Sequence, residues 1–190
     1  MSTVPLVKIQ AATASEICAR FDLKPEARRL LREEMAPGEF VTALLENKQY
    51  VTGIDFLAHA LPAREGVWWG CLCMQHACGD HLSAPERAAG IAAVRWVLQP
   101  TEENGEAAKV PAETAGATSP AGSLAMAANQ TGGSLAPTGA PAVPAAPSAP
   151  AKGIATAIKV ACTKGDPAKI LDTQRLYVNL GLEVAEGRII

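Results

Sequence analysis

The chain has 190 residues, enough for one domain with a substantial core or for one domain with a tail. Its formal net charge of −2 at pH 7 offers no overall attraction to nucleic acid or to an anionic membrane, so neither is an expected partner. Hydrophobic residues make up 48% of the chain but aromatic residues only 4%, and many of the rest are alanine. This composition favours closely packed helices over a β-sandwich.

The amino-terminal residues, MSTVPLVK, lack a basic region followed by a long apolar run. No window of the chain approaches the roughly 20 apolar residues that a membrane span needs. The five cysteines are an odd number in helix-like apolar contexts, which favours reduced thiols. Together these features predict a soluble protein of the cytoplasm.

The first helices of the chain are marked by capping signals and prolines. A capping box, in which a hydroxyl and a carboxylate satisfy each other's free backbone donors, is predicted at Thr13 and Glu16. Pro25 and Pro37 each fit the first turn of a following helix, where a missing N–H group costs nothing. A fourth helix is predicted over residues 49–59 from apolar positions at helical spacing.

The segment after Pro62 is predicted to be the central helix, with apolar residues on two sides. Such a helix is buried, so its neighbouring indoles, Trp68 and Trp69, should pack in opposite directions into two layers. A sixth helix follows the capping box Ser83-Ala-Pro-Glu86 and runs through Ile91, Ala92, Trp96 and Leu98. The residues predicted to form the structural core are Trp68, Trp69, Cys71, Leu72 and Trp96.

Composition divides the chain into four parts: a flexible N-terminus (1–12), a helical core domain (13–116), a low-complexity Ala/Gly/Pro-rich linker (117–150) and a C-terminal helix pair that docks on the core (151–190). Residues 134–150 in particular are predicted to be extended, because they cannot bury enough surface to offset the entropy of ordering. The expected fold is all-α: an irregular bundle of about eight short helices in layered pairs. A HEAT-like solenoid is the alternative, although no clear internal repeat is present.

One cluster of residue types could bind a metal ion: Cys71, Cys73, His76, Cys78 and His81. On one helix at most two or three of these side chains converge, whereas zinc needs four, so no metal and no cofactor are expected. A thiol nucleophile, for example Cys73 with His76 or Cys78 with His59, is also disfavoured. A catalytic thiol needs an exposed, electropositive setting, and these cysteines lie among tryptophans. We therefore predict a protein that is not an enzyme, with a metal- or thiol-dependent enzyme as the weakest alternative.

Four stretches of the chain carry a resemblance to a known family. These are residues 16–21 (EICARF), 56–65 (FLAHALPARE), 67–69 (VWW) and 132–137 (GGSLAP). They resemble an uncharacterised family of small bacterial helical proteins whose genes accompany type VI secretion clusters, and the HALP-xRE-x-VWW run is the specific part of the match. The likeness extends over most of residues 13–140 and carries no assigned functional residues.

The resemblance implies a protein that binds another protein, and a small-molecule ligand is not expected. The first expectation is an immunity protein that neutralises a co-encoded effector toxin. The toxin could be a basic nuclease, which acidic residues of this chain would attract. The acidic residues predicted to face that partner are Glu39, Glu46, Asp55, Glu102, Glu103 and Glu106. The alternative is an adaptor or chaperone that helps load an effector onto the secretion spike through an apolar groove.

Overall fold

A computed structural model describes residues 5–131 and 145–189 of the chain. Within these ranges every regular element is a helix and no strand occurs, which confirms the predicted all-α class. The helices are α1 (Ala14–Cys18), α2 (Pro25–Arg28), α3 (Pro37–Glu46), α4 (Tyr50–Ala60), α5 (Ala63–Cys78), α6 (Ala84–Leu98), α7 (Glu102–Ala107), α8 (Lys109–Ala115), α9 (Pro120–Asn129), α10 (Ala149–Ala161), the 3-10 turn η1 (Pro167–Lys169) and α11 (Ile170–Ala185).

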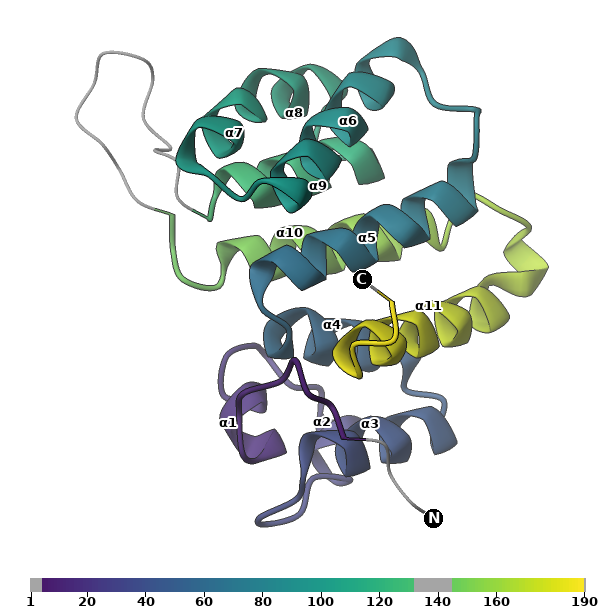
Figure 1. The fold of residues 1–190 in the computed structure, drawn as a ribbon. Coiled ribbons are helices and arrows are strands. Elements are labelled where there is room, and N and C mark those ends of the chain that lie inside the picture. The colour runs from purple at the N-terminus through teal and green to yellow at the C-terminus, as the bar shows by residue number, and fades with distance from the viewer. Residues whose placement is uncertain (1–4, 132–144, 190) are drawn as a thin grey trace.

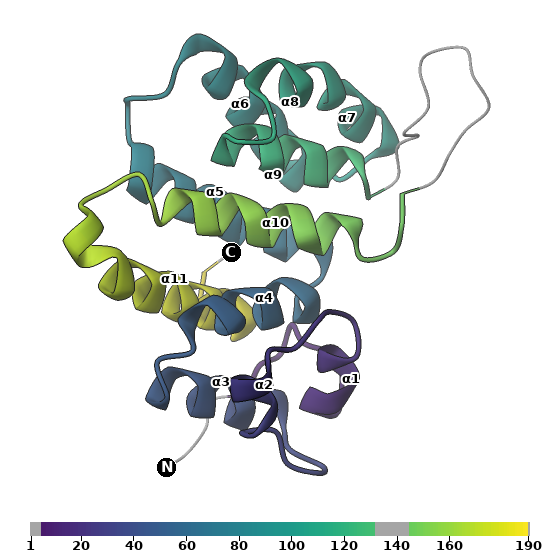
Figure 2. The same ribbon diagram turned by 180° about the vertical axis from the view of Figure 1, so that it is seen from behind.

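The helices form layers around α5 and α10, which run side by side through the middle of the molecule (Figures 1 and 2). On one side lie α6, α7, α8 and α9, and on the other lie α4 and α11, with α1 to α3 beyond them. The layers differ in the number and length of their helices, so no two-helix unit recurs along the described chain. This arrangement is an irregular bundle and not a regular solenoid.

Helix α5 is the buried centre of the bundle, because it contacts α4, α6, α9, α10 and α11. Helix α5 begins after Pro62 and is capped at its end by Gly79. Gly79 has a φ of 51°, a backbone conformation that residues other than glycine rarely adopt. The side chain of Trp69 is fully buried toward α11, while Trp68 is half-buried against the end of α6 and the carboxyl terminus. Trp69 therefore packs in the core against α11, whereas Trp68 lies at the edge of the core beside α6 and the end of α11.

Glycines on α5 and α11 let neighbouring helices approach very closely. A Cβ atom on Gly70 would lie 2.2 Å from Leu124 Cδ2, and one on Gly181 would lie 2.8 Å from Trp69 Cε2. Contacts this short leave no room for a methyl group, so these positions depend on small residues. The alanine-rich composition has the same role across the bundle, since it brings helix axes together with little side-chain volume between them.

The prediction of a linker over residues 117–150 is wrong for the parts that form α9 and the start of α10. Residues 120–129 form a helix whose N-cap is Ser119, and Leu124 and its neighbouring alanines are fully buried. The composition of this segment does not distinguish a linker from a core helix, because alanine and glycine are common both in flexible linkers and in closely packed helices. Helix α10 begins at Ala149 with Pro150 in its first turn, so these residues are not extended. The remaining part of the predicted tether, residues 132–144, lies outside the described residues.

The predicted flexible N-terminus also needs correction, for residues 5–12. The backbone N–H of Lys8 donates a hydrogen bond of 2.9 Å to the carbonyl of Ala185, and Leu6 and Ile9 pack against the core. The segment 102–116, for which no helix is predicted, forms α7 and α8. Helices α10 and α11 pack on α4, α5 and α9, which gives the carboxyl-terminal pair its place in the bundle. None of the described helices combines the length and the apolar content needed to cross a bilayer.

Candidate protein-binding groove

Helix α6 buries a group of small residues together with Trp96 and Val97, and it turns its two largest aliphatic residues outward. Ala89, Gly90 and Ala93 are buried, whereas the side chains of Ile91 and Leu98 are 63% and 70% exposed. The predicted sixth helix is present and runs through Ile91 and Leu98, but the side chains of these two residues face solvent. The small side chains allow α6 to approach α8 and α9, and that approach rotates the aliphatic stripe into solvent.

The outward stripe forms one wall of a groove between α6 and the end of α5. The groove has a volume of about 640 Å³. Its apolar lining comes from Met74 of α5, Leu82 of the connecting turn, and Ile91, Val94 and Leu98 of α6. Met74 is buried and packs closely against α6, because a Cβ atom built on Gly90 would lie 3.2 Å from Met74 Cε.

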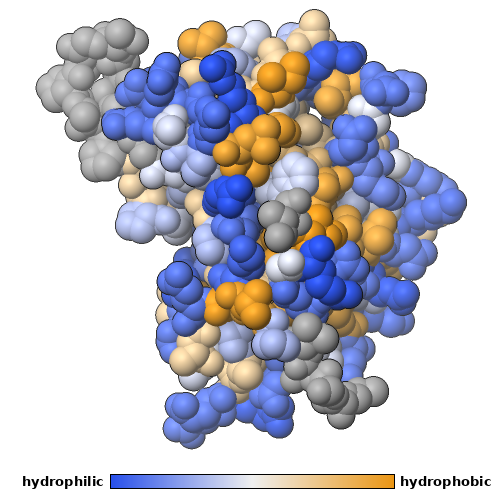
Figure 3. All heavy atoms as spheres, in the orientation of Figure 1, coloured by the Kyte–Doolittle hydropathy of each residue, from blue (hydrophilic) through white to orange (hydrophobic). Residues whose placement is uncertain are grey.

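A second, smaller hollow of about 220 Å³ continues the groove past Leu98, which lines both. Its lining includes Trp68, Val97, Val184 and Ile189. The space-filling view shows apolar side chains over this part of the molecule, running from α6 toward the carboxyl terminus (Figure 3). Exposed apolar surface that is continuous over two helices marks a binding site more often than scattered exposed residues do.

The charged residues that line the two hollows are mainly basic. Arg87 and Arg95 flank the aliphatic stripe of α6, and Asp80 is the one carboxylate among the described residues that line the larger hollow. In the smaller hollow, Lys8 Nζ pairs with Glu65 Oε1 at 3.6 Å, and Arg64 adds a further positive charge. The Nε of Arg64 donates a 2.8 Å hydrogen bond to the carbonyl of Val97, which fixes this guanidinium beside the end of α6. The groove is locally positive although the chain is not.

The six acidic residues predicted to contact a partner do not form one surface. Glu39 and Glu46 are exposed on α3, and Glu102, Glu103 and Glu106 are exposed on α7. Helices α3 and α7 lie at opposite ends of the molecule (Figure 1). A single flat partner site could therefore include the α7 group or the α3 pair, but not both.

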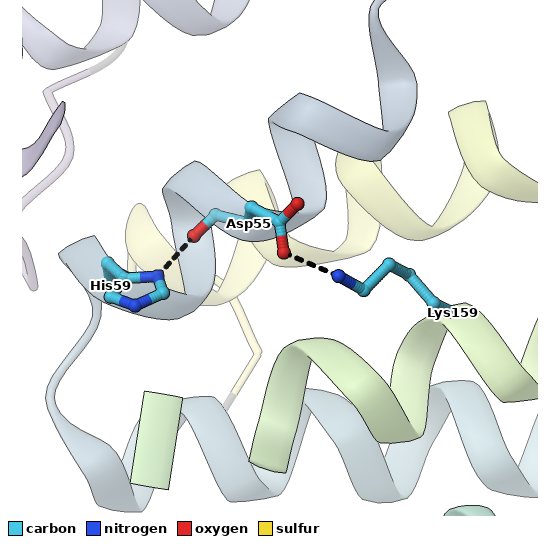
Figure 4. A network of polar contacts seen from close by, with 3 residues as sticks. All are labelled: Asp55, His59 and Lys159. Atoms are coloured by element: carbon cyan, nitrogen blue, oxygen red, sulfur yellow. Dashed lines mark hydrogen bonds and ion pairs between the residues drawn. The ribbon is translucent and has the colours of Figure 1, made fainter. Parts of the chain in front are cut away.

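Asp55, the sixth predicted acidic residue, already forms an ion pair with another residue of this chain. Its Oδ1 lies 2.7 Å from Lys159 Nζ, and this ion pair ties α4 to α10 (Figure 4). The backbone carbonyl of Asp55 also lies 2.8 Å from His59 Nδ1, so this nitrogen carries the proton and donates it. His59 thus donates within α4, to a carbonyl one turn earlier in the same helix.

The predicted core positions fall into two groups. Trp69, Cys71 and Trp96 are buried, whereas Trp68 and Leu72 are half-buried at the edge of the core. All five cysteines are free thiols. Burial raises the pKa of the Cys71 and Cys162 thiols to about 12, and it raises that of Cys73 well above its usual value, where the neighbouring Cys162 adds to the effect. These thiols are protonated and poorly nucleophilic at neutral pH.

The two histidines of the metal-like cluster are exposed, whereas Cys71 and Cys73 are buried. His76 is exposed, and its Nδ1 lies 3.1 Å from the hydroxyl of Tyr177; His81 is exposed in the turn after α5. Among the residues that the structure describes, no three His, Cys, Asp or Glu side chains come together in a way that could hold a metal ion. The absence of a metal site and of an enzymatic activity remain predictions.

These features define a class of protein: an all-α bundle with a tightly packed interior and an apolar, basic-flanked groove on its outside. The chain belongs to a family of unknown function, DUF6931, whose model matches residues 40–185. The matched range includes α5, α6 and the whole groove apart from Lys8 and Ile189. No curated protein and no solved structure matches the chain.

Proposed function

We propose that this protein is a non-enzymatic adaptor that holds another protein in the groove between α5 and α6. One observation carries the proposal: Ile91 and Leu98, two large aliphatic side chains on one face of α6, are left exposed beside a hollow of about 640 Å³. Leaving such residues in water forgoes roughly 1.5–3 kcal/mol for each that could be buried. A partner that covers them recovers this free energy on binding.

The resemblance to a family linked with type VI secretion clusters suggests what the partner is. In that setting the proposed partner is a secreted effector, and the adaptor works in the cytoplasm, where effectors are loaded onto the spike. The groove supports the adaptor function over the immunity function, because the acidic residues expected of an immunity protein are divided between α3 and α7. Asp55 is already paired with Lys159.

Immunity remains the second candidate, and the exposed group Glu102, Glu103 and Glu106 on α7 is the observation that favours it. Three carboxylates within two turns could attract a basic toxin surface and speed its association. The two functions thus use different surfaces of the same molecule, which makes them separable by substitution.

Co-expression with an effector toxin encoded beside this gene, which the resemblance implies, tests the proposal. The wild-type protein should copurify with the toxin through its delivery domain, and Leu98→Asp should abolish the complex. Val110→Asp is the matched control, because Val110 is 68% exposed on α8 and does not line the groove. Rescue of growth that survives Leu98→Asp but is lost when Glu102, Glu103 and Glu106 are changed to glutamine would contradict the adaptor function and support immunity.

A further inference from the structure

The shape of the groove restricts what can occupy it. Its walls are two helices, and the described residues include no strand whose edge could pair with an extended peptide. Peptides bind such proteins by laying an amphipathic helix along the groove, since a helix satisfies its own backbone hydrogen bonds. The aliphatic positions Ile91, Val94 and Leu98 repeat at i, i+3 and i+7, which is one face of α6 over two turns, or about 10 Å.

The charges beside the stripe restrict the occupant further. Arg87 and Arg95 are exposed at positions eight residues apart on α6, about 12 Å along its axis. Arg64 lies where the groove continues into the smaller hollow. A segment with acidic residues beside its apolar stripe would meet these cations, whereas a basic segment would be repelled.

A second copy of this chain fits the groove poorly. In a two-fold symmetric pair the same patch contacts itself, so α6 would pack on α6. That contact would bring the Arg87 and Arg95 guanidinium groups of the two copies together. Like charges at an interface favour dissociation, so the charge pattern selects a different, acidic partner.

We infer that the groove takes an amphipathic helical segment of about three turns, with an apolar stripe that covers Ile91, Val94 and Leu98 and with acidic residues that face Arg87 and Arg95. This inference rests on the proposed function and specifies its partner. The apolar contact supplies the affinity, and the two arginines set the direction and the register of the bound helix.

Two synthetic helical peptides of about 15 residues test the charge requirement. Both carry leucines at i, i+3 and i+7; one has glutamates beside the stripe, eight residues apart, and the other has lysines there. The glutamate peptide should bind the full-length chain at least about tenfold more tightly, because two attractive pairs replace two repulsive ones. The preference should disappear in Arg87→Gln/Arg95→Gln, and both peptides should lose affinity for Leu98→Asp but not for Val110→Asp. Equal binding of the two peptides, or binding that survives Leu98→Asp, would overturn the inference.

Photo-crosslinking in the copurified complex separates this inference from the proposed function. A photoreactive residue at position 91 should crosslink to a segment of the partner that is helical, apolar on one face and acidic beside it. Crosslinking to a basic or an extended segment of the partner overturns the inference while the adaptor function stands. If no complex forms, or if the crosslinks join two copies of this chain, the proposed function and the inference both fail.

Discussion

The indole nitrogen of Trp69 on α5 donates a 2.8 Å hydrogen bond to the backbone carbonyl of Tyr177 on α11. Both residues are completely buried, and 108 positions of sequence separate them. The contact joins the central helix to the last helix of the chain at the point where Gly181 lets α11 approach the indole ring. This relationship makes the carboxyl-terminal helix part of the core.

Trp69→Phe tests the contribution of that hydrogen bond. Phenylalanine keeps an aromatic ring but lacks the donor and leaves part of the indole volume empty. The free energy of unfolding should fall by about 2–4 kcal/mol, the sum of a lost buried hydrogen bond and a small cavity. Urea denaturation measures it, and a change below about 0.5 kcal/mol would show that α11 does not depend on this contact.

Gly181→Ala tests the close approach of α11 to Trp69. The added methyl group would lie within 3 Å of the indole and of Leu57 Cδ1, so α11 must shift outward. We expect a loss of about 1–3 kcal/mol from overpacking, against the small gain that alanine normally brings to a helix. Gly165→Ala is the control, because a Cβ atom there meets nothing within 4 Å.

The exposed stripe of α6 and the buried residues beneath it should respond in opposite ways to substitution. Leu98→Asp should change the free energy of unfolding by no more than about 0.5 kcal/mol, since Leu98 is mostly in water. Leu124→Ala, at a fully buried position of α9, should cost about 2–5 kcal/mol. Thermal unfolding of both variants decides the matter. A strongly destabilised Leu98→Asp variant would mean that Leu98 belongs to the core.

Thiol reactivity should divide the cysteines by burial. Cys78 is half-buried, whereas Cys71, Cys73 and Cys162 are buried, and desolvation raises the pKa of all four thiols. In the native protein at pH 8, a disulfide reagent should therefore modify Cys78 first, and the buried thiols should react only after urea unfolds the chain. Fast modification of Cys73 in the native state would point to an accessible thiol and would reopen a thiol-dependent activity.

His59 predicts a dependence of stability on pH. Burial is the main cause that lowers the pKa of His59 below its usual 6.5, and the charges of Lys152 and Arg20 contribute. The unfolded chain therefore binds a proton at His59 more readily than the folded chain does, so stability is greatest above pH 6.5 and decreases as the pH falls. His59→Gln should reduce this slope between pH 7 and 5, and His81→Gln, at an exposed position, is the control. An unchanged slope in His59→Gln would exclude His59 as its source.

The sequence predicts α5 well because two signals agree there. Apolar residues occupy both sides of the helix, and Pro62 marks where it begins. Most other helix boundaries also follow from local chemistry, such as the capping box between Ser83 and Glu86, whose hydroxyl and carboxylate are 2.7 Å apart. Local signals of this kind depend on a few adjacent residues, so they can be recognised without knowledge of the fold.

The groove could not be predicted in the same way, because it depends on which face of α6 is buried. Apolar residues occupy more than one face of α6, and the close contact with α8 and α9 buries the face with Ala89, Ala93 and Trp96. Helix α9 could not be predicted for a related reason: it is rich in alanine and glycine, which also occur in flexible linkers. One signal was available: three large aliphatic residues and two arginines share one face of α6, whereas Ala89, Ala93 and the indole of Trp96 share the opposite face.

Hydrogen exchange of the full chain, alone and in complex with its effector, tests the central claim most directly. We predict slower exchange over the turn and helix that form the groove, residues 79–99, with no change in α3 or α7. Slower exchange in α7 or α3 without any effect on residues 79–99 would contradict the claim that this protein acts through the α5–α6 groove.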